Sequence, residues 1–570
     1  MIRPAAAGSR VPSSAAADFG RRLLLTTLAL GASLALTARG AEINPSALFS
    51  YRGLHAVTQV LRGLWPPALS VEFLSYVGPL VLQTLALSLL GVLLAAILAL
   101  PFIAFATGTL THWGALVEME SGERRALGRL LYAVSRTVLN VVRAVPELAW
   151  AIVFVTVVGL GPLAGVLALG VTYAGMVGKV IAEVLESVDQ RPLEALAQAG
   201  ATRAQVLLFG ILPQAYPDAI SFMLYVWDCT MRAAVILGIV GAGGVGYALL
   251  VSVNTLAYGQ VATLLVVMLA LVALTDMVSV AIRGAHVLPP GTHIAARKRI
   301  AIPPWLSLSV AVIAATAAAS YLGLQPWAIA AQQPLAHLAA WGAKAFPPDF
   351  SWGFVVSTLP AVWQTIAMAF WSIVLAVVLA WPLSILATST VTLPGRLLEL
   401  DGGSPLRAAF GRALYWGTRG LFSFLRAVPE IVWALLAIVV VGPGAFAGVL
   451  ALAMHTTGVL GRLYADVLED TETRPLELLA GAGARPTSVW LFGMLPAALP
   501  QLLTHTIYRL EMNVRAATVV GIVGAGGIGQ MIYNDAQTYH YHALVTLIII
   551  TLALVSAADA ISSYLRRLIL

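Results

Sequence analysis

Charged side chains recur at one fixed spacing inside long apolar stretches of this 570-residue chain. The pentapeptide RAVPE occurs twice, and it supplies Arg143 with Glu147 and then Arg426 with Glu430. Four residues apart on one helix, the two charges of each copy can neutralise each other. The proline between them removes a backbone donor and predicts a kink. The pattern indicates either a self-paired kink, in which Arg143 also satisfies a freed carbonyl, or arginines that face a central pathway and attract an anion.

A second pair of arginines precedes a glycine cluster in each half of the chain. Arg232 and Arg515 are each followed by small and apolar residues and then by GIVGAGG. An acid one turn earlier, Asp228 or Glu511, lies at the right spacing to pair with each arginine. The alternatives for both arginines are therefore direct contact with an anion and a structural ion pair.

The glycine clusters GAGGVG and GAGGIG are further candidates for contact with an anion. No strand precedes them, which excludes a dinucleotide-binding loop. Such glycines can turn amide N–H groups toward an anion, or they can allow close packing or a re-entrant turn. The pathway candidates of this region are Gly243, Gly244, Gly526 and Gly527, with Asn513 two residues before Arg515.

No pattern in the sequence predicts catalysis, a metal site or a cofactor. The single cysteine, Cys229, excludes a disulfide framework and a Cys-rich metal site. No nucleophile–base pair, carboxylate pair or histidine spacing supports an active site. The G-x-x-x-x-G-K-[ST] loop is absent, and its nearest approach, GMVGKV at 175–180, has the wrong spacing. The net charge of +7 indicates membrane orientation rather than nucleic-acid binding.

Composition defines the elements that must position these residues. Hydrophobic residues make up 59% of the chain and charged residues 10%, whereas an average soluble domain is about 25% charged. A spanning helix needs about 20 continuous apolar residues, and a barrel strand needs only about ten in alternation. The long apolar runs therefore predict an all-α integral membrane protein embedded in a lipid bilayer.

The chain is an internal duplication. The two RAVPE copies lie 283 residues apart, and the RPLE, LFG and GIVGAGG motifs recur at the same offset. Repeats of this length indicate two similar structural units. We expect two parallel six-helix repeats, residues 1–283 and 304–570, joined by a cytosolic linker at 284–303.

About twelve apolar segments are the expected spans. They are 23–39, 79–106, 127–158, 163–185, 207–240, 260–282, 304–323, 357–388, 410–441, 445–467, 490–523 and 543–565. Residues 23–39 precede a poor cleavage site, so we expect a retained span rather than a signal peptide. With the N-terminus inside, 20 Lys and Arg residues fall in cytosolic segments and four in outside segments.

Between the fourth and fifth spans, each repeat carries a loop of the same pattern. Residues 194–213 read EALAQAGATRAQVLLFGILP and residues 477–496 read ELLAGAGARPTSVWLFGMLP. Both resemble the EAA loop of importer permeases of the ATP-binding-cassette superfamily, a short cytosolic helix and glycine turn that dock on an ATPase subunit. The resemblance assigns ATPase coupling to Glu194, Ala195, Gly200, Glu477, Leu478 and Gly483. The alternative is an ordinary loop between helices.

Other motifs resemble one subfamily, the phosphonate-type permeases. They are RAVPE followed by tryptophan, HTTGVLGRLYADVLED at 455–470 and NVRAATVVGIVGAGGIGQ at 513–530. Gly210 and Gly493 depart from the general EAA pattern, which has an apolar residue there, but they suit this subfamily. The resemblance covers most of both repeats and is closest in the second. Members usually have half this length and act as homodimers, so two permeases are fused here.

The resemblance implies a type I importer permease fold in the bacterial inner membrane. It implies an extracytoplasmic binding protein that delivers phosphonate or a related phosphorus oxyanion, and two copies of a separate ATPase that bind ATP and Mg²⁺. The alternatives are a twelve-span transporter driven by an ion gradient, an ATP-driven importer of another small solute, and a membrane enzyme. Only the ATP-driven importers need paired EAA-like loops.

Overall fold

A computed structural model describes residues 37–38, 40, 42–111, 122–286, 304–324, 334–393 and 405–569, and every regular element within these ranges is helical. The predicted all-α class is confirmed. The predicted span at 23–39 lies almost wholly outside the described residues, and so does the 284–303 linker beyond the end of helix α13 at His286.

The first repeat contains long spans and short connecting helices. They are α2 (Pro45–Phe49), α3 (Tyr51–Gly63), α4 (Val71–Ala106), α5 (Gly108–Thr111), α6 (Gly122–Ala144), α7 (Glu147–Val158), α8 (Pro162–Glu186), α9 (Gln190–Gln198), α10 (Arg203–Val206), η1 (Leu207–Ile211), α11 (Leu212–Leu237), η2 (Gly238–Ala242), α12 (Val245–Asn254) and α13 (Tyr258–His286). Helices suit these apolar sequences because a backbone in lipid must satisfy its hydrogen bonds internally.

The second repeat follows the same order. Its elements are α14 (Pro304–Tyr321), α16 (Pro334–Ala345), α17 (Trp352–Leu386), α18 (Ser389–Thr392), α19 (Pro405–Ala427), α20 (Glu430–Val441), α21 (Ala445–Glu469), α22 (Thr473–Gly481), α23 (Pro486–Val489), η3 (Trp490–Met494), α24 (Leu495–Val520), η4 (Gly521–Ala525), α25 (Gly527–Gln537) and α26 (Tyr541–Ile569). The predicted duplication is therefore visible as a repeated series of helices.

Two predicted spans are broken rather than straight, and a third bend follows directly after the predicted span 490–523. Seven described helices are long and apolar enough to cross a bilayer singly, and three further pairs qualify only together. The bends are 86° between α6 and α7, 92° between α19 and α20, and 56° between η4 and α25. The predicted kink at each RAVPE motif is confirmed, but it is a nearly right-angled corner, so 127–158 and 410–441 are each two helices.

Described segments near the start of each repeat pack against the other repeat. Helix α14, which begins the second repeat, packs along α4 of the first repeat, and the Tyr321 hydroxyl donates to the Pro79 carbonyl at 2.9 Å. In the other direction, the backbone at Gly40 lies against Trp363 of α17. Helix α16 likewise packs on α7. The boundary between the repeats in the sequence is therefore not a boundary in the packing.

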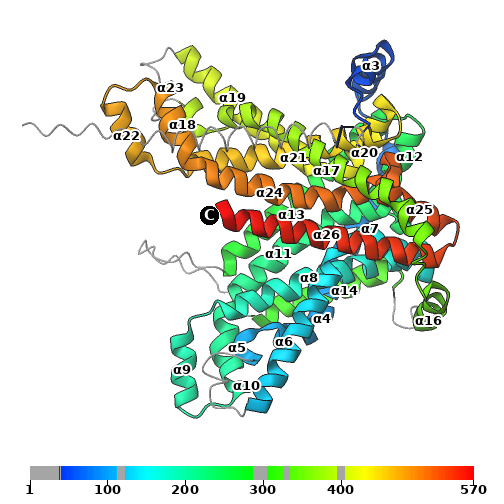
Figure 1. Cartoon of the computed structure of the whole chain (residues 1–570), viewed down its shortest axis with the longest axis vertical. Coiled ribbons are helices and arrows are strands. Elements are labelled where there is room, and N and C mark those ends of the chain that lie inside the picture. Colours follow the sequence, from blue (N-terminus) through cyan, green and yellow to red (C-terminus); the bar gives the residue numbers. More distant parts are fainter. Residues whose placement is uncertain are drawn as a thin grey trace, which may run out of the picture.

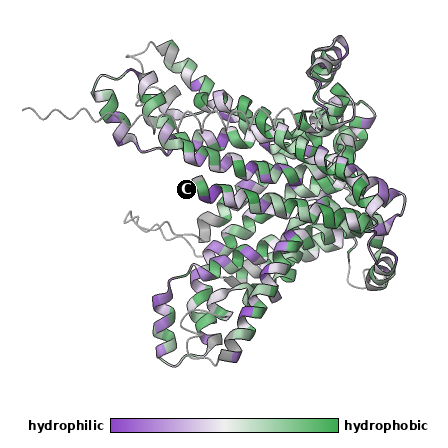
Figure 2. Cartoon of the chain, viewed as in Figure 1, coloured by the Kyte–Doolittle hydropathy of each residue, from purple (hydrophilic) through white to green (hydrophobic). Residues whose placement is uncertain are grey.

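The long helices form two arms that meet at one end of the molecule (Figure 1). Helices α4, α6, α8 and α11 form one arm, helices α17, α19, α21 and α24 form the other, and α13 and α26 lie between them. We call the end with α9 and α22, where the arms diverge, the inner end, and the end with α3, α16 and α25 the outer end. Hydrophobic residues dominate the long helices, and hydrophilic residues are frequent on α9 (Figure 2).

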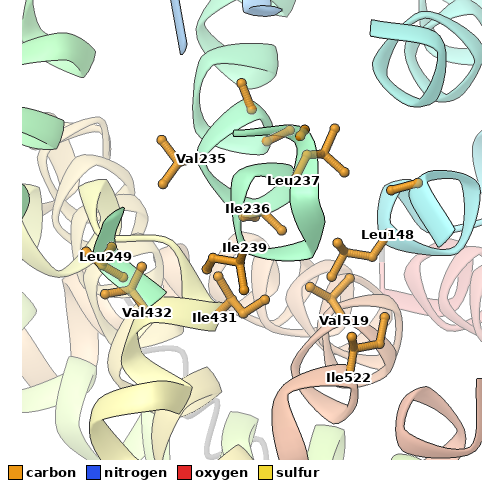
Figure 3. Packing of buried hydrophobic residues seen from close by; sticks show 14 of the residues in the cluster. Leu148, Val235, Ile236, Leu237, Ile239, Leu249, Ile431, Val432, Val519 and Ile522 are labelled. Carbon is orange, nitrogen blue, oxygen red and sulfur yellow. The ribbon is translucent and has the colours of Figure 1, made fainter. Parts of the chain in front are cut away.

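Apolar side chains of both repeats close the region where the arms meet (Figure 3). Leu148 of α7, Ile239 of η2, Ile431 of α20 and Ile522 of η4 are buried in one cluster. A cavity of about 380 Å³ on the outer side of the cluster shares Ile239 and Ile522 with it. The cluster also contains Val519, which lines a second cavity on its inner side. The cluster therefore lies between the two cavities.

Candidate functional site

A cavity of about 410 Å³ lies between the repeats on the inner side of the apolar cluster. Its polar and charged lining residues come from α6, α7, α8, α11, α20 and α24. They are Arg143, Glu147, Thr172, Tyr173, Lys179, Glu183, Tyr225, Cys229, Glu430, Tyr508, Glu511 and Arg515. Four of the eleven predicted pathway residues line this cavity: Arg143, Glu147, Glu430 and Arg515.

The corner in the RAVPE motif determines the positions of Arg143 and Glu147. Pro146 has no N–H for the carbonyl of Val142, so the first helix ends and α7 begins directly after the proline. The indole N–H of Trp150 donates to the Val142 carbonyl at 3.4 Å instead. Glu147 then occupies the first turn of α7, where the helix dipole favours a negative charge.

The second repeat builds the same corner. The indole N–H of Trp433 donates to the Leu425 carbonyl at 3.2 Å, which is the acceptor that Pro429 leaves free. Glu430 begins α20 as Glu147 begins α7. The expectation that Arg143 satisfies the freed carbonyl is wrong, because a tryptophan performs this task in both repeats.

The expected pairing of Arg143 with Glu147 is also not formed. The corner removes the i,i+4 helical geometry, and Arg143 instead forms an ion pair with Asp559 of α26 at 3.2 Å. This pair joins the first repeat to the second repeat. Arg426, the counterpart of Arg143, is exposed and does not line the cavity.

The second pair of arginines differs between the repeats. Arg232 forms the ion pair with Asp228 at 2.9 Å that the spacing allowed, and it does not line the cavity. Arg515 lines the cavity, while Glu511 lies 3.7 Å from Arg566 of α26. The buried Nε atoms of Arg232 and Arg515 both have no hydrogen-bond partner within the described ranges, so the cavity lining is what distinguishes the two arginines. Of these two arginines, Arg515 is therefore the one placed to meet a solute.

Asn513 is engaged in packing between helices. Its Nδ2 donates to the Ser372 hydroxyl at 2.9 Å, and its Oδ1 accepts from the Thr456 hydroxyl at 3.0 Å. The side chain is buried and ties α24 to α17 and α21. The structure therefore places Asn513 outside the cavity lining, in a position that joins three helices.

The predicted glycines form turns with positive φ at the outer end. Gly243 and Gly244 have φ of +88° and +75°, and Gly526 and Gly527 have φ of +89° and +70°, which an L side chain rarely adopts. The Gly244 N–H donates to Oε1 of Gln83 at 2.9 Å. The amide of Gly527 is bound by Gln364 of α17 in the same way, at 2.6 Å. These N–H groups are bonded to α4 and α17, so the close-packing interpretation describes them better than anion contact.

The two EAA-like loops lie at the inner end. Glu194 and Ala195 are exposed on α9, and Glu477 and Leu478 are exposed on α22. Each short helix is followed by an exposed glycine with positive φ, +82° at Gly200 and +84° at Gly483. The six predicted coupling residues are therefore exposed together on two protruding elements. They are Glu194, Ala195, Gly200, Glu477, Leu478 and Gly483.

Close packing explains why Gly210 and Gly493 stand where the general EAA pattern has an apolar residue. A Cβ on Gly210 would lie 2.6 Å from Leu193 of α9, and a Cβ on Gly493 would lie 2.7 Å from Leu476 of α22. Both leucines are buried. The glycines thus let each exposed helix sit close to the start of the following span.

Sequence reasoning missed several cavity residues. Lys179 and Glu183 of α8 line the cavity, which therefore extends toward the inner end. Tyr225 and Tyr508 also line it. The recurrence of these two tyrosines at the offset of 283 residues is the sequence signal that could have identified them.

The fold and the site define a class of protein. A duplicated, multi-helix membrane protein with a charged cavity between its repeats, closed on one side by apolar side chains, has the architecture of a solute transporter. Family comparison agrees, because residues 113–286 and 403–570 each match the "Binding-protein-dependent transport system inner membrane component". The chain belongs to this family.

One relative aligns with nearly the whole chain, and other matches cover about two fifths of it. The "Phosphate-import permease protein PhnE" of Mycolicibacterium smegmatis is 30% identical over 538 residues, 93% of this chain and 92% of that protein. The "Phosphite transport system permease protein PtxC" of Stutzerimonas stutzeri is 40% identical over 243 residues, 41% of this chain and 82% of that protein. A chain of the MetNI methionine ABC transporter, solved in an inward-facing conformation, is 25% identical, with 38% of this chain and 97% of that chain covered and a TM-score of 0.33.

These findings confirm the predicted resemblance. The chain is the permease of an ATP-binding-cassette importer, with two permease repeats fused in one polypeptide and multiple spans in the bacterial inner membrane. Its helical fold, its two repeats and its apolar spans are those that the resemblance implied.

Proposed function

We propose that the chain imports phosphonate or a related phosphorus oxyanion through the cavity between its repeats. The observation that supports this proposal is the cavity lining, in which Lys179 and Arg515 lie beside Glu147 and Glu430. A phosphorus oxyanion that retains a proton offers acceptor oxygens to Lys and Arg and an O–H donor to a carboxylate. The phosphate import and the phosphite transport that are named for two relatives support the same solute class.

A cavity lining with both positive and negative side chains suits transport of a solute better than tight binding of it. A transport site must bind strongly enough to admit the solute and weakly enough to release it. Arg143 and Glu183 already have ionic partners, Asp559 and Arg136, at 3.2 Å and 3.1 Å. The remaining positive groups face carboxylates in the same cavity, so they attract an oxyanion without holding it as tightly as a cluster of unopposed arginines would.

Energy comes from partner subunits in this proposal. The sequence has no phosphate-binding loop for ATP, and it presents two exposed EAA-like helices, α9 and α22, at the inner end. Two such helices call for two copies of an ATPase subunit, which bind ATP and Mg²⁺. The family description supports delivery of the solute by a binding protein at the opposite, extracytoplasmic end.

Uptake by the reconstituted transporter tests this function. Proteoliposomes containing the permease with its ATPase and binding protein should take up phosphate, phosphite or methylphosphonate when ATP is present, and they should not take up sulfate at a comparable rate. Uptake that follows a proton or sodium gradient without ATP would contradict the importer. ATP-driven uptake of none of the phosphorus compounds would contradict the solute class alone.

Two glycines at and just after the end of α22 test the coupling role. Gly483 adopts φ of +84° with open space around it, so Gly483→Ala strains the backbone without a clash, at a cost of about 1–2 kcal/mol. Gly481 lies two residues earlier, at the end of α22, and also has open space. We expect Gly483→Ala to weaken co-purification with the ATPase and Gly481→Ala to leave it unchanged; equal effects would contradict the coupling role.

A further inference from the structure

Two equivalent helices contribute unequally to the cavity between the repeats. Helix α8 of the first repeat and helix α21 of the second are related by the offset of 283 residues. Within the described part of the chain, no residue of α21 lines this cavity. Helix α8 contributes six lining residues, which are Thr172, Tyr173, Met176, Lys179, Val180 and Glu183. The cavity therefore follows α8 and not its counterpart in the other arm.

These six residues form a stripe that runs toward the inner end, and we call it the α8 stripe. Its members recur three or four residues apart, so their side chains share one face of the helix. From Thr172 to Glu183 the stripe is about 16 Å long, at the ordinary rise of an α-helix. Helix α8 ends at Glu186, and the exposed helix α9 follows it at the inner end (Figure 1). The stripe thus leads to the end at which the proposed importer releases its solute.

Side chains at the matching positions of α21 are bonded within the second repeat. His455 and Thr456 correspond to the first two residues of the α8 stripe. The Nδ1 atom of His455 lies 3.1 Å from the carbonyl oxygen of Val428. The Thr456 hydroxyl donates to Oδ1 of Asn513 at 3.0 Å. These bonds hold the polar groups of α21 against α24 and the second RAVPE corner, so they are not offered to a solute.

The basic residues of the two helices also differ in their partners. In the first repeat, Glu183 binds Arg136 of α6 at 3.1 Å. Lys179, one turn before Glu183, has no hydrogen-bond or ionic partner in the part of the chain that the structure describes. In the second repeat, the matching Arg462 forms an ion pair with Asp466 at 3.0 Å. The first repeat therefore presents an unpaired cation to the cavity, and the second neutralises its cation within α21.

Other basic residues do not reverse this difference. The second arm carries an additional arginine, Arg509 of α24, which has no basic counterpart in the first repeat. Neither Arg509 nor Arg462 lines the cavity. Arg143 does line it, but an ion pair already engages its guanidinium. Among the described residues, the cations that line the cavity without an ionic partner are therefore Arg515 and Lys179.

We propose that the oxyanion leaves the cavity along the α8 stripe, on one side of the pseudo-symmetric molecule, and that Lys179 draws it from Arg515 toward the inner end. The inference rests on the proposed function, which supplies the solute and its direction. Arg515 lies one turn before Val519 of the apolar cluster, so it meets the solute at the closed end of the cavity. Lys179 carries its charge on a flexible four-carbon stem, which suits transfer better than a planar guanidinium does. Glu183, the last residue of the stripe, is neutralised by its ion pair and does not repel the anion.

Matched substitutions in the two repeats test this route. Lys179→Met and Arg462→Met each remove one positive charge and keep an unbranched side chain. Proteoliposomes that contain the permease with its ATPase and binding protein are assayed for initial uptake of phosphate, phosphite and methylphosphonate. We expect Lys179→Met to lower the maximal uptake rate about tenfold and Arg462→Met to change it less than twofold. The binding-protein concentration for half-maximal ATPase stimulation should stay unchanged in both variants, because delivery of the solute precedes its exit.

A conservative variant separates the charge of Lys179 from a structural role. Lys179→Arg keeps the cation, so its maximal uptake rate should stay within threefold of the wild-type rate. A loss as large as that of Lys179→Met would show that the charge does not matter, and it would overturn the proposal. Lys179 has no ion pair to lose, and the pair of Arg462 is half-exposed and contributes little to stability. If Lys179→Met nevertheless folds poorly, Lys179→Gln replaces it in the same comparison.

The outcomes separate this inference from the proposed function. If the wild-type complex imports a phosphorus oxyanion and the two Met variants lose uptake equally, the one-sided exit is wrong and the importer stands. A larger loss in Arg462→Met would also overturn the exit along α8. If the wild-type complex shows no ATP-driven uptake of any of the three compounds, the proposed solute class fails and this inference fails with it.

Discussion

The RAVPE corners depend on a tryptophan hydrogen bond, and removing that bond has a calculable cost. Trp150→Phe and Trp433→Phe each keep an aromatic ring but delete the indole N–H that bonds to the carbonyl left free by proline, at 3.4 Å and 3.2 Å respectively. A net hydrogen bond contributes about 0.5–1.5 kcal/mol, and bonds between membrane helices average about 0.6 with a maximum near 1.7.

The expected loss lies near the middle of this range, above the average for bonds between membrane helices. Pro146 and Pro429 have no N–H that could replace the lost donor, so each carbonyl would remain unpaired in a segment with little water. We expect each substitution to lower the free energy of unfolding by about 1 kcal/mol through the lost bond, with the larger loss at Trp433 because its bond is shorter. The two corners are in different repeats, so the double variant should lose about the sum.

Equilibrium unfolding in mixed detergent micelles measures this cost. The control is Trp371→Phe, because the buried Nε1 of Trp371 has no hydrogen-bond partner within the described ranges. Trp371→Phe therefore reports the loss of ring volume alone, and the hydrogen-bond term is the difference between the variants. If Trp371→Phe destabilises the protein as much as Trp150→Phe and Trp433→Phe do, the tryptophan bonds do not hold the corners.

Two further predictions concern the turns and the cavity. Gln83→Leu should destabilise the protein by about 1–3 kcal/mol, because it leaves the Gly244 N–H of the glycine turn unpaired. The control is Gln59→Leu, at an exposed position of α3. Equal unfolding curves for the two variants would contradict the role of Gln83. Arg515→Ala should lower uptake of phosphorus oxyanions several-fold more than Arg426→Ala, with ATPase assembly intact in both variants. The reason is that Arg515 lines the cavity and Arg426 does not. The reverse order in initial uptake rates would remove Arg515 from the pathway.

The sequence predicted most of the architecture because its signals are local or repetitive. Long apolar runs define helices in a bilayer whatever they later pack against. The offset between copies reveals the duplication, and the EAA-like loops stand out because a glycine with positive φ must follow a short exposed helix. Gly200 and Gly483 have this conformation in the structure.

The site was predicted less completely, because side chains that line a cavity are chosen by packing between distant segments. Spacing placed Arg143 and Glu147 on one helix face, but the corner at Pro146 directed Arg143 to Asp559, 416 residues further along the chain. Asn513 and the glycine amides looked available in the sequence, yet neighbouring helices occupy their hydrogen bonds. Nothing local in the sequence indicates such partners.

The sequence alone thus determined that the chain is helical, lies in a membrane, is duplicated and resembles an importer permease, because hydrophobicity, charge bias and repeats are properties of the linear chain. Only the tertiary structure decided that helix α14 of the second repeat packs on α4 of the first repeat, and which charged side chains face the cavity. The physical reason is that burial and ion pairing depend on contacts between segments hundreds of residues apart, and these contacts exist only after the helices have packed.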